Sequence, residues 1–477
     1  MTGDPGRPAV LSPPYRTVLK PYGRALVDLA RRRPEVVCLS GDLTRQCEVD
    51  LFQAEFGDRF IHAGMAEANM IGVAGALARQ GFMPFVHSFG VFTTRRPLDQ
   101  IVNAVAYPGL PVRIVGFMPG VSSPGGPSHQ AIEDVALMRA IPGMTVIDVA
   151  DATQTAQAVA AMAGVPGPVY LRLKRGEIPV LFPRDHAFSL DRAQVLEWRG
   201  EEMGGGAQTT GGAGTRGGGV TTGGADTRGG ALTGGGADTG GGPVTEGGAD
   251  NRGGALTGGG AQIDGGAQTG GAAVHDGGGV SSGAGVSAGG GIRGAAGGGG
   301  ITGGAAGAAI TGGAGSGGIR PGSRAWPARP VPGSDVALLV SGMMVAPALA
   351  AARVLQAAGA ATVVVNIPVI KPLDAATVLA VAGASTAVVT AENHSVVGGL
   401  GSAVAETLAE AGLGRPLRRV GLADTFAEGA RTSAYLFTMY GLTTQHIVDT
   451  AWSVLGRPGS PPRVPPLPAD AGEYAPV

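Results

Sequence analysis

The sequence predicts an α/β protein with two doubly wound domains that a long glycine-rich insert separates. Short apolar runs typical of buried strands alternate with helical segments on both sides of the insert, and this alternation favours parallel sheets covered by helices on both faces. Within the insert the composition collapses to glycine, alanine and threonine. A chain of 477 residues is long enough for two or three domains, each with its own core.

The two domains are expected at residues 15–195 and 333–456, and the insert at about 200–330. Proline-rich tails at residues 1–14 and 457–477 are expected to be flexible. The insert holds most of the 87 glycines and repeats Gly-Gly-Ala blocks every twelve residues. Calcium-binding β-helix repeats differ, because they have a shorter period and a large apolar residue in each turn. Side chains this small cannot offset the entropy lost on ordering, so we expect a disordered linker.

The expected strands are apolar runs bounded by turn residues or proline. In the first domain they cover residues 36–40, 83–88, 112–116, 145–149 and 169–173, and in the second domain residues 336–342, 361–366 and 387–391. Segments of helical composition lie between the strands, and Pro34 ends the first of them. The expected helices cover residues 15–33, 67–78, 99–107, 132–140, 153–163 and 346–358.

Charge and cysteine content narrow the class of protein. The 35 basic and 36 acidic residues leave a net charge of −1, so no nucleic-acid partner is indicated. Cys38 lies in an apolar strand and Cys47 in a loop, which supports neither a disulfide framework nor a metal site. The sequence has no apolar leader and no uninterrupted apolar stretch of about 18 residues. We therefore expect a cytoplasmic protein that does not enter a membrane.

The strongest chemical signal is a single carboxylate, Glu67, followed by an apolar run of small residues typical of a closely packed helix. We expect Glu67 to start this buried helix without a partner for its charge. Burying a charged carboxylate is costly unless it is paired, and burial favours the protonated form, which donates a hydrogen bond. This makes Glu67 a functional candidate. An acid in a first helical turn also complements the helix dipole without any chemistry, so both interpretations stay open.

Aromatic and polar residues follow two of the expected strands. Phe89 and Phe92 come directly after residues 83–88, at the strand end where ligands bind in open α/β sheets, so their rings are placed to stack on a flat ligand. A spacing of three residues also fits a role in the core. Asp42 follows the strand at residues 36–40 and marks either a ligand loop or an ordinary turn.

Three motifs in this order resemble the pyrimidine-binding half of the transketolase family. They are Gly-Met-Ala-Glu-Ala-Asn-Met at residues 64–70, the aromatic pair Phe89 and Phe92, and Gly-Pro-Ser-His-Gln at residues 126–130. The second domain resembles the C-terminal domain of transketolases in the order of its elements. Its glycine run at residues 398–404 is similar to a dinucleotide fingerprint, but Val404 stands where the third glycine belongs, so no nucleotide site is expected.

The resemblance implies thiamine diphosphate as the cofactor. Glu67 would hydrogen-bond a ring nitrogen of the aminopyrimidine and favour its imino tautomer, and Phe89 would pack on the ring with Phe92 nearby. Asp42 and Leu43 match a family loop that lies beside the cofactor. The implied reaction transfers a two-carbon ketol unit from a ketose or its phosphate to an aldose acceptor, and the cofactor does the difficult chemistry.

The resemblance also implies two substrate contacts. His129 would face the substrate as a hydrogen-bond donor or proton carrier. Arg175 is similar to a family arginine that holds a sugar phosphate, since a guanidinium forks well onto phosphate oxygens, although a solvated loop arginine is the alternative. Gly125 and Phe117 stand where many transketolases have a substrate-recognising aspartate and a histidine. These departures leave the sugar open, and His62 and His87, which could compensate, are expected to be structural histidines.

The resemblance covers residues 15–182 and 333–455, which is only the second half of a transketolase. The diphosphate-binding half, whose Gly-Asp-Gly motif and asparagine hold a divalent metal, has no counterpart in the sequence. The implied partner is therefore an N-terminal subunit that supplies the Mg²⁺ ligands in an α2β2-like split transketolase. Alternatives are a 1-deoxyxylulose-5-phosphate synthase-like enzyme, a 2-oxo-acid dehydrogenase β-subunit-like enzyme, and a non-catalytic homologue that only binds a partner. Retention of Glu67, Phe89 and His129 together argues against the last.

Overall fold

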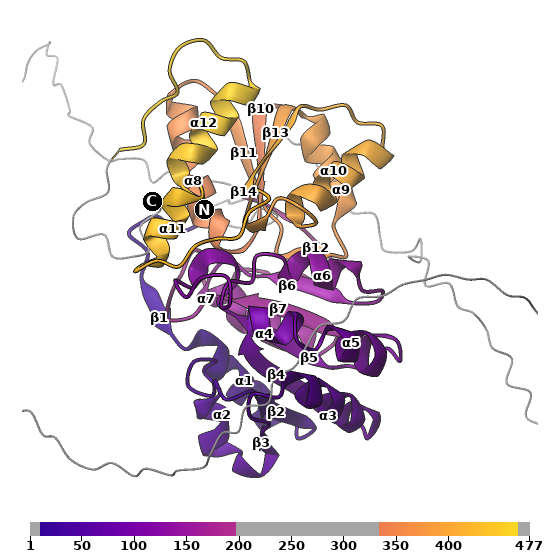
Figure 1. Ribbon diagram of the computed structural model, residues 1–477. Helices are drawn as coiled ribbons and strands as arrows, with labels where there is room; N and C mark the ends of the chain where they lie inside the picture. The colour runs from indigo at the N-terminus through magenta and orange to yellow at the C-terminus, as the bar shows by residue number, and fades with distance from the viewer. Residues whose placement is uncertain (1–9, 197–332, 466–477) are drawn as a thin grey trace, which may run out of the picture. The chain divides into compact units, whose positions relative to one another are not determined.

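The computed structural model describes residues 10–196 and 333–465 (Figure 1). The insert expected at residues 200–330 lies outside the described residues. Parts of both expected tails are packed: Val10 is buried, the Leu11 N–H donates to the Leu181 carbonyl over 2.8 Å, and the Val464 N–H donates to Gln445 Oε1 over 2.8 Å. The tails that the sequence predicts to be flexible are therefore held in place over the described residues.

The first sheet has seven strands in the order β12-β6-β7-β5-β4-β2-β3. Six of them are parallel, which confirms the α/β class, and β12 alone runs antiparallel, against β6. The strands are β2 (Val36–Ser40), β3 (Phe60–His62), β4 (Met83–Phe89), β5 (Arg113–Phe117), β6 (Thr145–Asp148), β7 (Val169–Leu173) and β12 (Val369–Lys371).

Helices cover both faces of this sheet, as the doubly wound prediction requires. Alternate strand residues point to opposite faces, so Cys38 packs in one apolar cluster while Val37 and Leu39 pack in the other. On the Cys38 face lie α1 (Pro21–Arg32), α2 (Asp50–Glu55) and α7 (Ala152–Met162). On the opposite face lie α3 (Glu67–Arg79), the π-helix η2 (Ile101–Ala106) and α6 (Asp134–Ala140). Shorter pieces are η1 (Gly57–Arg59), α4 (Gly90–Thr94), α5 (Leu98–Gln100) and η3 (Gly120–Ser122).

The second sheet has five strands in the order β14-β13-β10-β11-β9. They are β9 (Gln194–Leu196), β10 (Ser334–Val340), β11 (Thr362–Asn366), β13 (Ser385–Ser395) and β14 (Leu417–Leu422). One face is covered by α8 (Val345–Ala357) and α12 (Thr444–Val454), and the other by α9 (Ala375–Gly383) and α10 (Leu400–Glu410) (Figure 1). The remaining pieces are η4 (Gly342–Met344) and α11 (Ser433–Met439).

Each half of the chain gives an edge strand to the other half's sheet. β9, just before the insert, pairs antiparallel with β11, with Val195 opposite Val365. β12, from the second half, pairs antiparallel with β6, with Val369 opposite Ile147. The sequence did not predict either strand. The exchange means that the expected boundary at residue 195 falls inside a strand of the second sheet.

Two expected helices take a different form. The helix expected at residues 15–33 begins only at Pro21, because Thr17–Leu19 is a strand, β1, that pairs antiparallel with β8 (Glu177–Pro179). Proline suits this first helical position, where its missing N–H is not needed. The helix expected at residues 99–107 is realised as α5 followed by the π-helix η2. In the described parts of the chain, no helix has both the length and the apolar character needed to cross a bilayer.

Candidate functional site

The candidate residues all follow the carboxyl ends of parallel strands in the first sheet. Arg175 follows β7, His129 lies in the loop after β5, Phe89 ends β4, Asp42 follows β2, and Glu67 comes shortly after β3. These strands are neighbours in the order β7-β5-β4-β2-β3. Because parallel strands end at the same edge, side chains that are far apart in the sequence share one edge of the sheet, which is where α/β proteins bind ligands.

Glu67 is the first residue of α3, as expected, but its carboxylate is not alone. Both of its oxygens accept hydrogen bonds from Nη1 of Arg96, each over 3.0 Å. The Glu67 side chain is 2% exposed and the Arg96 side chain 50% exposed. The expectation of an unpaired carboxylate is therefore wrong, because an arginine from beyond α4 offsets the cost of burying the charge.

Aromatic rings extend the cluster from this ion pair. The Arg96 guanidinium carbon lies 4.1 Å from the ring centroid of Phe92. The rings of Phe92 and Phe89 are stacked, with 6.0 Å between their centroids and 22° between their planes. His129 meets both rings edge-on, with its centroid 5.3 Å from that of Phe92 and 6.4 Å from that of Phe89. The structure thus brings Glu67, Phe89, Phe92 and His129 into one continuous set of contacts, which Arg96 completes.

The loop that carries His129 is held by Arg95. Its Nη1 donates to the Pro127 carbonyl over 2.9 Å, and its Nη2 donates to the Gln130 carbonyl over 3.1 Å and to the Glu133 carboxylate over 2.8 Å. These bonds fix the backbone on both sides of His129. The two neighbouring arginines thus have different contacts: Arg95 holds the loop that carries His129, whereas Arg96 pairs with the buried Glu67 carboxylate.

The loop conformation gives a physical reason for the glycine at position 125. A Cβ atom on Gly125 would lie 2.9 Å from the Cβ of His129, so any side chain there would push His129 aside. Phe117, the second departure from the family pattern, is fully buried and packs edge-on against Tyr22 with 5.5 Å between centroids. It belongs to the apolar core, in the cluster that also contains Phe89.

Asp42 and His62 lie together at the ends of β2 and β3. Asp42 has a left-handed backbone, with φ of 70°, and its Oδ1 lies 3.4 Å from Nε2 of His62. Both side chains are about half exposed, while the neighbouring Leu43 packs against the core. His87 is fully buried: its Nδ1 is 2.9 Å from the Leu39 carbonyl and its Nε2 is 2.6 Å from the Tyr22 hydroxyl. Burial lowers the pKa of His87 to about 4, so this histidine is neutral at pH 7.

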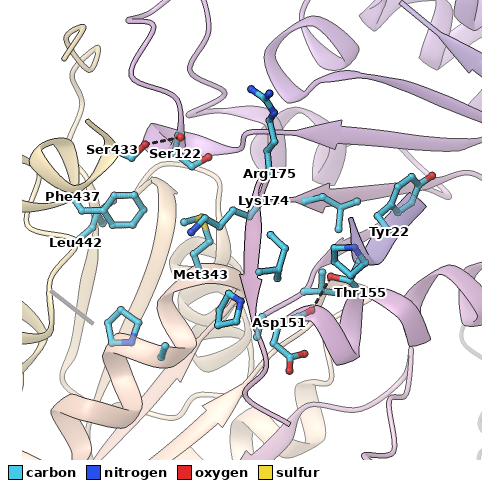
Figure 2. Close-up of a pocket in the computed structure, with 18 of the residues that line it drawn as sticks. Tyr22, Ser122, Asp151, Thr155, Lys174, Arg175, Met343, Ser433, Phe437 and Leu442 are labelled. Carbon is cyan, nitrogen blue, oxygen red and sulfur yellow. Dashed lines mark hydrogen bonds between the residues drawn. The ribbon is translucent and has the colours of Figure 1, made fainter. Parts of the chain in front are cut away.

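Arg175 lies apart from the Glu67 cluster, at the mouth of a cavity of about 220 Å³. Among the described residues it makes no hydrogen bond, ion pair or ring contact with Glu67, Phe92 or His129. Figure 2 shows its guanidinium pointing away from the Met343 side of the cavity. Other lining residues include Tyr22, Asp151, Lys174, Phe437 and Leu442. Arg175 is exposed, which leaves its donors available to a ligand that approaches from solvent.

Two acidic residues that line this cavity accept hydrogen bonds from backbone N–H groups. Asp151 accepts hydrogen bonds from the N–H groups of Gln154, Leu181 and Phe182 over 2.7, 2.8 and 2.9 Å, and burial raises its pKa to about 6. Glu48 accepts from the Gly23 N–H over 3.0 Å, and burial raises its pKa to about 7. Both carboxylates therefore serve as structural acceptors rather than as free acids.

A buried ionic network, which the sequence did not reveal, joins the two halves of the chain behind the site. Arg172 donates to Asp134 over 2.8 Å, to Asp148 over 2.9 Å and to the Asn393 carbonyl over 3.0 Å. The Asn393 side chain in turn accepts from the Val121 N–H over 3.0 Å. The second domain thus holds the start of the loop that carries His129.

The glycine run after β13 leads into α10, and a carboxylate caps the start of this helix. The Glu392 carboxylate accepts from the N–H groups of Leu400 and Gly401 over 2.6 and 2.8 Å at the start of α10. A Cβ on Gly399 would lie only 2.0 Å from this carboxylate. The cap therefore occupies the place that a phosphate would need. In the described ranges, no three His, Cys, Asp or Glu side chains are grouped as metal ligands.

The chain is similar to proteins of one family over both halves. The transketolase pyrimidine-binding domain matches residues 16–180, and the transketolase C-terminal domain matches residues 328–447. The 6-deoxy-6-sulfo-D-fructose transketolase subunit SqwH of Clostridium sp. (strain MSTE9) is 31% identical over 437 residues, 91% of this chain and 94% of that protein. A putative transketolase C-terminal section of Methanocaldococcus jannaschii is 38% identical over 189 residues, 39% of this chain and 60% of that protein.

A solved structure described as a split gene transketolase, an inactive beta4 tetramer, is also similar. It is 29% identical to the chain, with a TM-score of 0.60, and the match covers 92% of this chain and 99% of that one. The similarity to this structure and to SqwH extends over both domains.

Proposed function

The chain belongs to the transketolase family, and from that premise we propose that it is the thiamine-diphosphate-dependent C-terminal subunit of a split transketolase. The reaction is transfer of a two-carbon ketol unit from a ketose phosphate to an aldose acceptor. One observation carries the proposal: a buried carboxylate, Glu67, is linked through Arg96 to the stacked rings of Phe89 and Phe92, and His129 lies against the same rings.

The described residues fit the aminopyrimidine of the cofactor. The Arg96 guanidinium is a planar group with N–H donors, and it already lies over Phe92 while it donates to both oxygens of Glu67. An aminopyrimidine is also planar, and its ring nitrogen, when it carries a proton, presents an N–H to a carboxylate. A site that accommodates the first group between an aromatic face and a buried carboxylate has the chemistry to hold the second.

Glu67, Phe89 and Phe92 bind and orient the cofactor in this proposal. When bound, thiamine diphosphate would supply the carbon nucleophile and the electron sink that cleavage of a ketose carbon–carbon bond requires. Glu67 hydrogen-bonds a ring nitrogen and controls the proton there, and its burial strengthens that bond. The two phenylalanine rings fix the plane of the pyrimidine. Asp42 and Leu43, at the end of β2, line the same edge.

His129 and Arg175 act on the substrate. His129 lies against Phe92, so a substrate carbon near the pyrimidine is within reach of its imidazole, which donates a hydrogen bond or carries a proton to a substrate oxygen. Its Nδ1 is 2.9 Å from Ser128 Oγ, which helps to orient the ring. Arg175 is exposed after β7 and binds the phosphate end of the sugar.

The second half of the site comes from a partner. The chain matches nearly all of SqwH, which is described as a transketolase subunit, and it matches a C-terminal section of M. jannaschii. We infer an N-terminal subunit that binds the diphosphate through Mg²⁺, in an α2β2 assembly. The inactivity stated for the beta4 tetramer of the split gene transketolase supports a need for such a subunit.

A second donor class is a ketose with a sulfonate in place of the phosphate. SqwH is named a 6-deoxy-6-sulfo-D-fructose transketolase subunit, and an arginine such as Arg175 can bind either anion. Gly125 favours a donor that differs from the usual sugars, since it contributes no polar side chain where many transketolases carry one.

The test is reconstitution with a candidate N-terminal subunit. Calorimetry measures thiamine diphosphate and Mg²⁺ binding to the chain alone and to the mixture, and a coupled assay measures two-carbon transfer from a ketose phosphate and from its sulfonate analogue. We expect tight binding and transfer only in the mixture, and a loss of at least about 100-fold in transfer for Glu67→Ala. Full activity of Glu67→Ala would refute the catalytic assignment.

A further inference from the structure

We propose that the Arg96 side chain is an internal cap on the cofactor site. Its guanidinium occupies the position of the aminopyrimidine, between Glu67 and Phe92, until cofactor binding displaces it. The inference rests on the proposed function, since it takes Glu67 and Phe92 as the pyrimidine site. It adds an intramolecular competitor for that site. The exchange makes and breaks only hydrogen bonds, an ion pair and a ring contact.

The geometry of Arg96 is that of an occupant. A single nitrogen, Nη1, donates to both oxygens of Glu67 over 3.0 Å each, so the carboxylate faces this one donor. The guanidinium carbon is 4.1 Å from the Phe92 ring centroid, which is a cation–π contact. A ring that packs on Phe92 and bonds Glu67 needs the same aromatic face and the same oxygens. The two groups cannot bind together.

Arg96 is free to leave, whereas its neighbour is not. The Arg96 side chain is 50% exposed, so its long stem can carry the guanidinium into solvent. Arg95 is bound to the carbonyls of Pro127 and Gln130 and to Glu133. The chain therefore places a retractable arginine next to a fixed one. Retraction of Arg96 exposes Glu67 without disturbing the loop that carries His129.

In a split enzyme, the cap would stabilise the Glu67 carboxylate of a subunit that has not yet bound its partner. A subunit that waits for its partner would otherwise hold the buried Glu67 carboxylate without a counter-charge, which is strongly unfavourable. Arg96 supplies that charge, and the cofactor must then compete for the carboxylate. If only a fraction of the chains has Arg96 retracted, the apparent dissociation constant is the intrinsic constant divided by that fraction. The cap therefore weakens binding to the free subunit.

The test uses a probe that needs only the pyrimidine site, namely hydroxymethyl-aminopyrimidine, the pyrimidine half of thiamine. Ligand-observed NMR measures its dissociation constant for the full chain without a partner. Arg96→Gln keeps a hydrogen-bond donor for Glu67 but loses the charge and the cation–π contact. We expect it to bind the probe about tenfold more tightly than the unmodified chain, a change of about 1.4 kcal/mol. The matched control is Arg31→Gln, at an exposed arginine paired with Asp28 and Glu55, which should leave the constant unchanged.

Further variants distinguish failure of the cap proposal from failure of the proposed function. If Arg96→Gln does not fold, Arg96→Lys retains the charge but cannot lie flat on Phe92, and it should also bind the probe more tightly. Equal or weaker probe binding by the folded variants, while the unmodified chain with its partner binds thiamine diphosphate, would overturn the cap and make Arg96 a positioning residue for Glu67. If the unmodified chain with partner binds no thiamine diphosphate, and Glu67→Gln makes no difference, the proposed function itself fails.

Discussion

The buried Glu48 carboxyl makes the free energy of unfolding of this protein depend on pH. The residue is 3% exposed and has a left-handed backbone, with φ of 62°. Its carboxylate accepts the Gly23 N–H over 3.0 Å at the start of α1, where Lys20 at the N-cap provides no side-chain cap. Burial raises the pKa of Glu48 from 4.5 to about 7, and the hydrogen bonds from the backbone only partly oppose this. The folded protein therefore binds this proton more tightly than the unfolded chain does.

The magnitude follows from the shift. A pKa that rises from 4.5 to about 7 corresponds to about 3 kcal/mol, at about 1.4 kcal/mol for each unit. Because the folded pKa is the higher one, this stability is fully present below pH 4.5 and is lost as the pH rises through 7. Glu48→Gln keeps a carbonyl oxygen for the Gly23 N–H but does not ionise. We expect the variant to be more stable than the unmodified chain by up to about 3 kcal/mol at pH 8, and by less than about 1 kcal/mol at pH 5.

The assay is urea unfolding of both proteins at pH 5 and pH 8, with the difference in free energy of unfolding as the readout. Taking the difference cancels other titrating groups, among them Asp151, whose pKa burial raises to about 6, and His87, whose pKa burial lowers to about 4. Asp28→Asn, at an exposed carboxylate, is the control and should change stability by at most about 1 kcal/mol at either pH. If the difference between Glu48→Gln and the unmodified chain is the same at pH 5 and pH 8, the reasoning is refuted.

Three further predictions concern the network, the loop and the substrate. Arg172→Met should destabilise the chain by about 3–5 kcal/mol in urea unfolding, because it leaves two buried aspartates without a cation, and a loss below about 1 kcal/mol would contradict the network's role. Gly125→Ala should lower kcat/KM by about 10- to 100-fold in the reconstituted enzyme, because a Cβ there displaces His129, while thiamine diphosphate affinity stays the same. Arg175→Gln should raise KM for a ketose phosphate by about 10- to 100-fold and leave KM for an unphosphorylated ketose unchanged, and equal effects on both sugars would exclude phosphate binding.

The sequence predicts features that depend on local pattern. The eight strands that the sequence predicts are apolar runs, and the start of α3 at Glu67 follows from a run of small apolar residues after a single acid. Arg96, the partner of Glu67, is 29 residues away in the sequence. No local sequence pattern distinguishes it from other exposed arginines. Tertiary contact alone decides which arginine reaches the carboxylate.

Short edge strands escape prediction for a related reason. β9 and β12 each have three residues, too few to show a period of two, and each exists because the other half of the chain offers an unpaired strand edge. The residues before Pro21 are expected to be helical, but Thr17 and Val18 are β-branched residues that favour strands, and pairing of β1 with β8 makes this segment a strand. The short strands therefore depend on pairing with segments that are distant in the sequence.

The second domain does more than pack against the first, because it holds the loop that carries His129 at several points. The Asn393 side chain donates to the Pro119 carbonyl over 3.0 Å, the Gln130 side chain donates to the Glu428 carbonyl over 3.1 Å, and the Ser433 hydroxyl donates to the Ser122 carbonyl over 2.8 Å. Arg95, from the first domain, holds the same loop from its other side. The position of His129 therefore depends on both domains, and a change in the packing of the second domain would reach His129 through this loop.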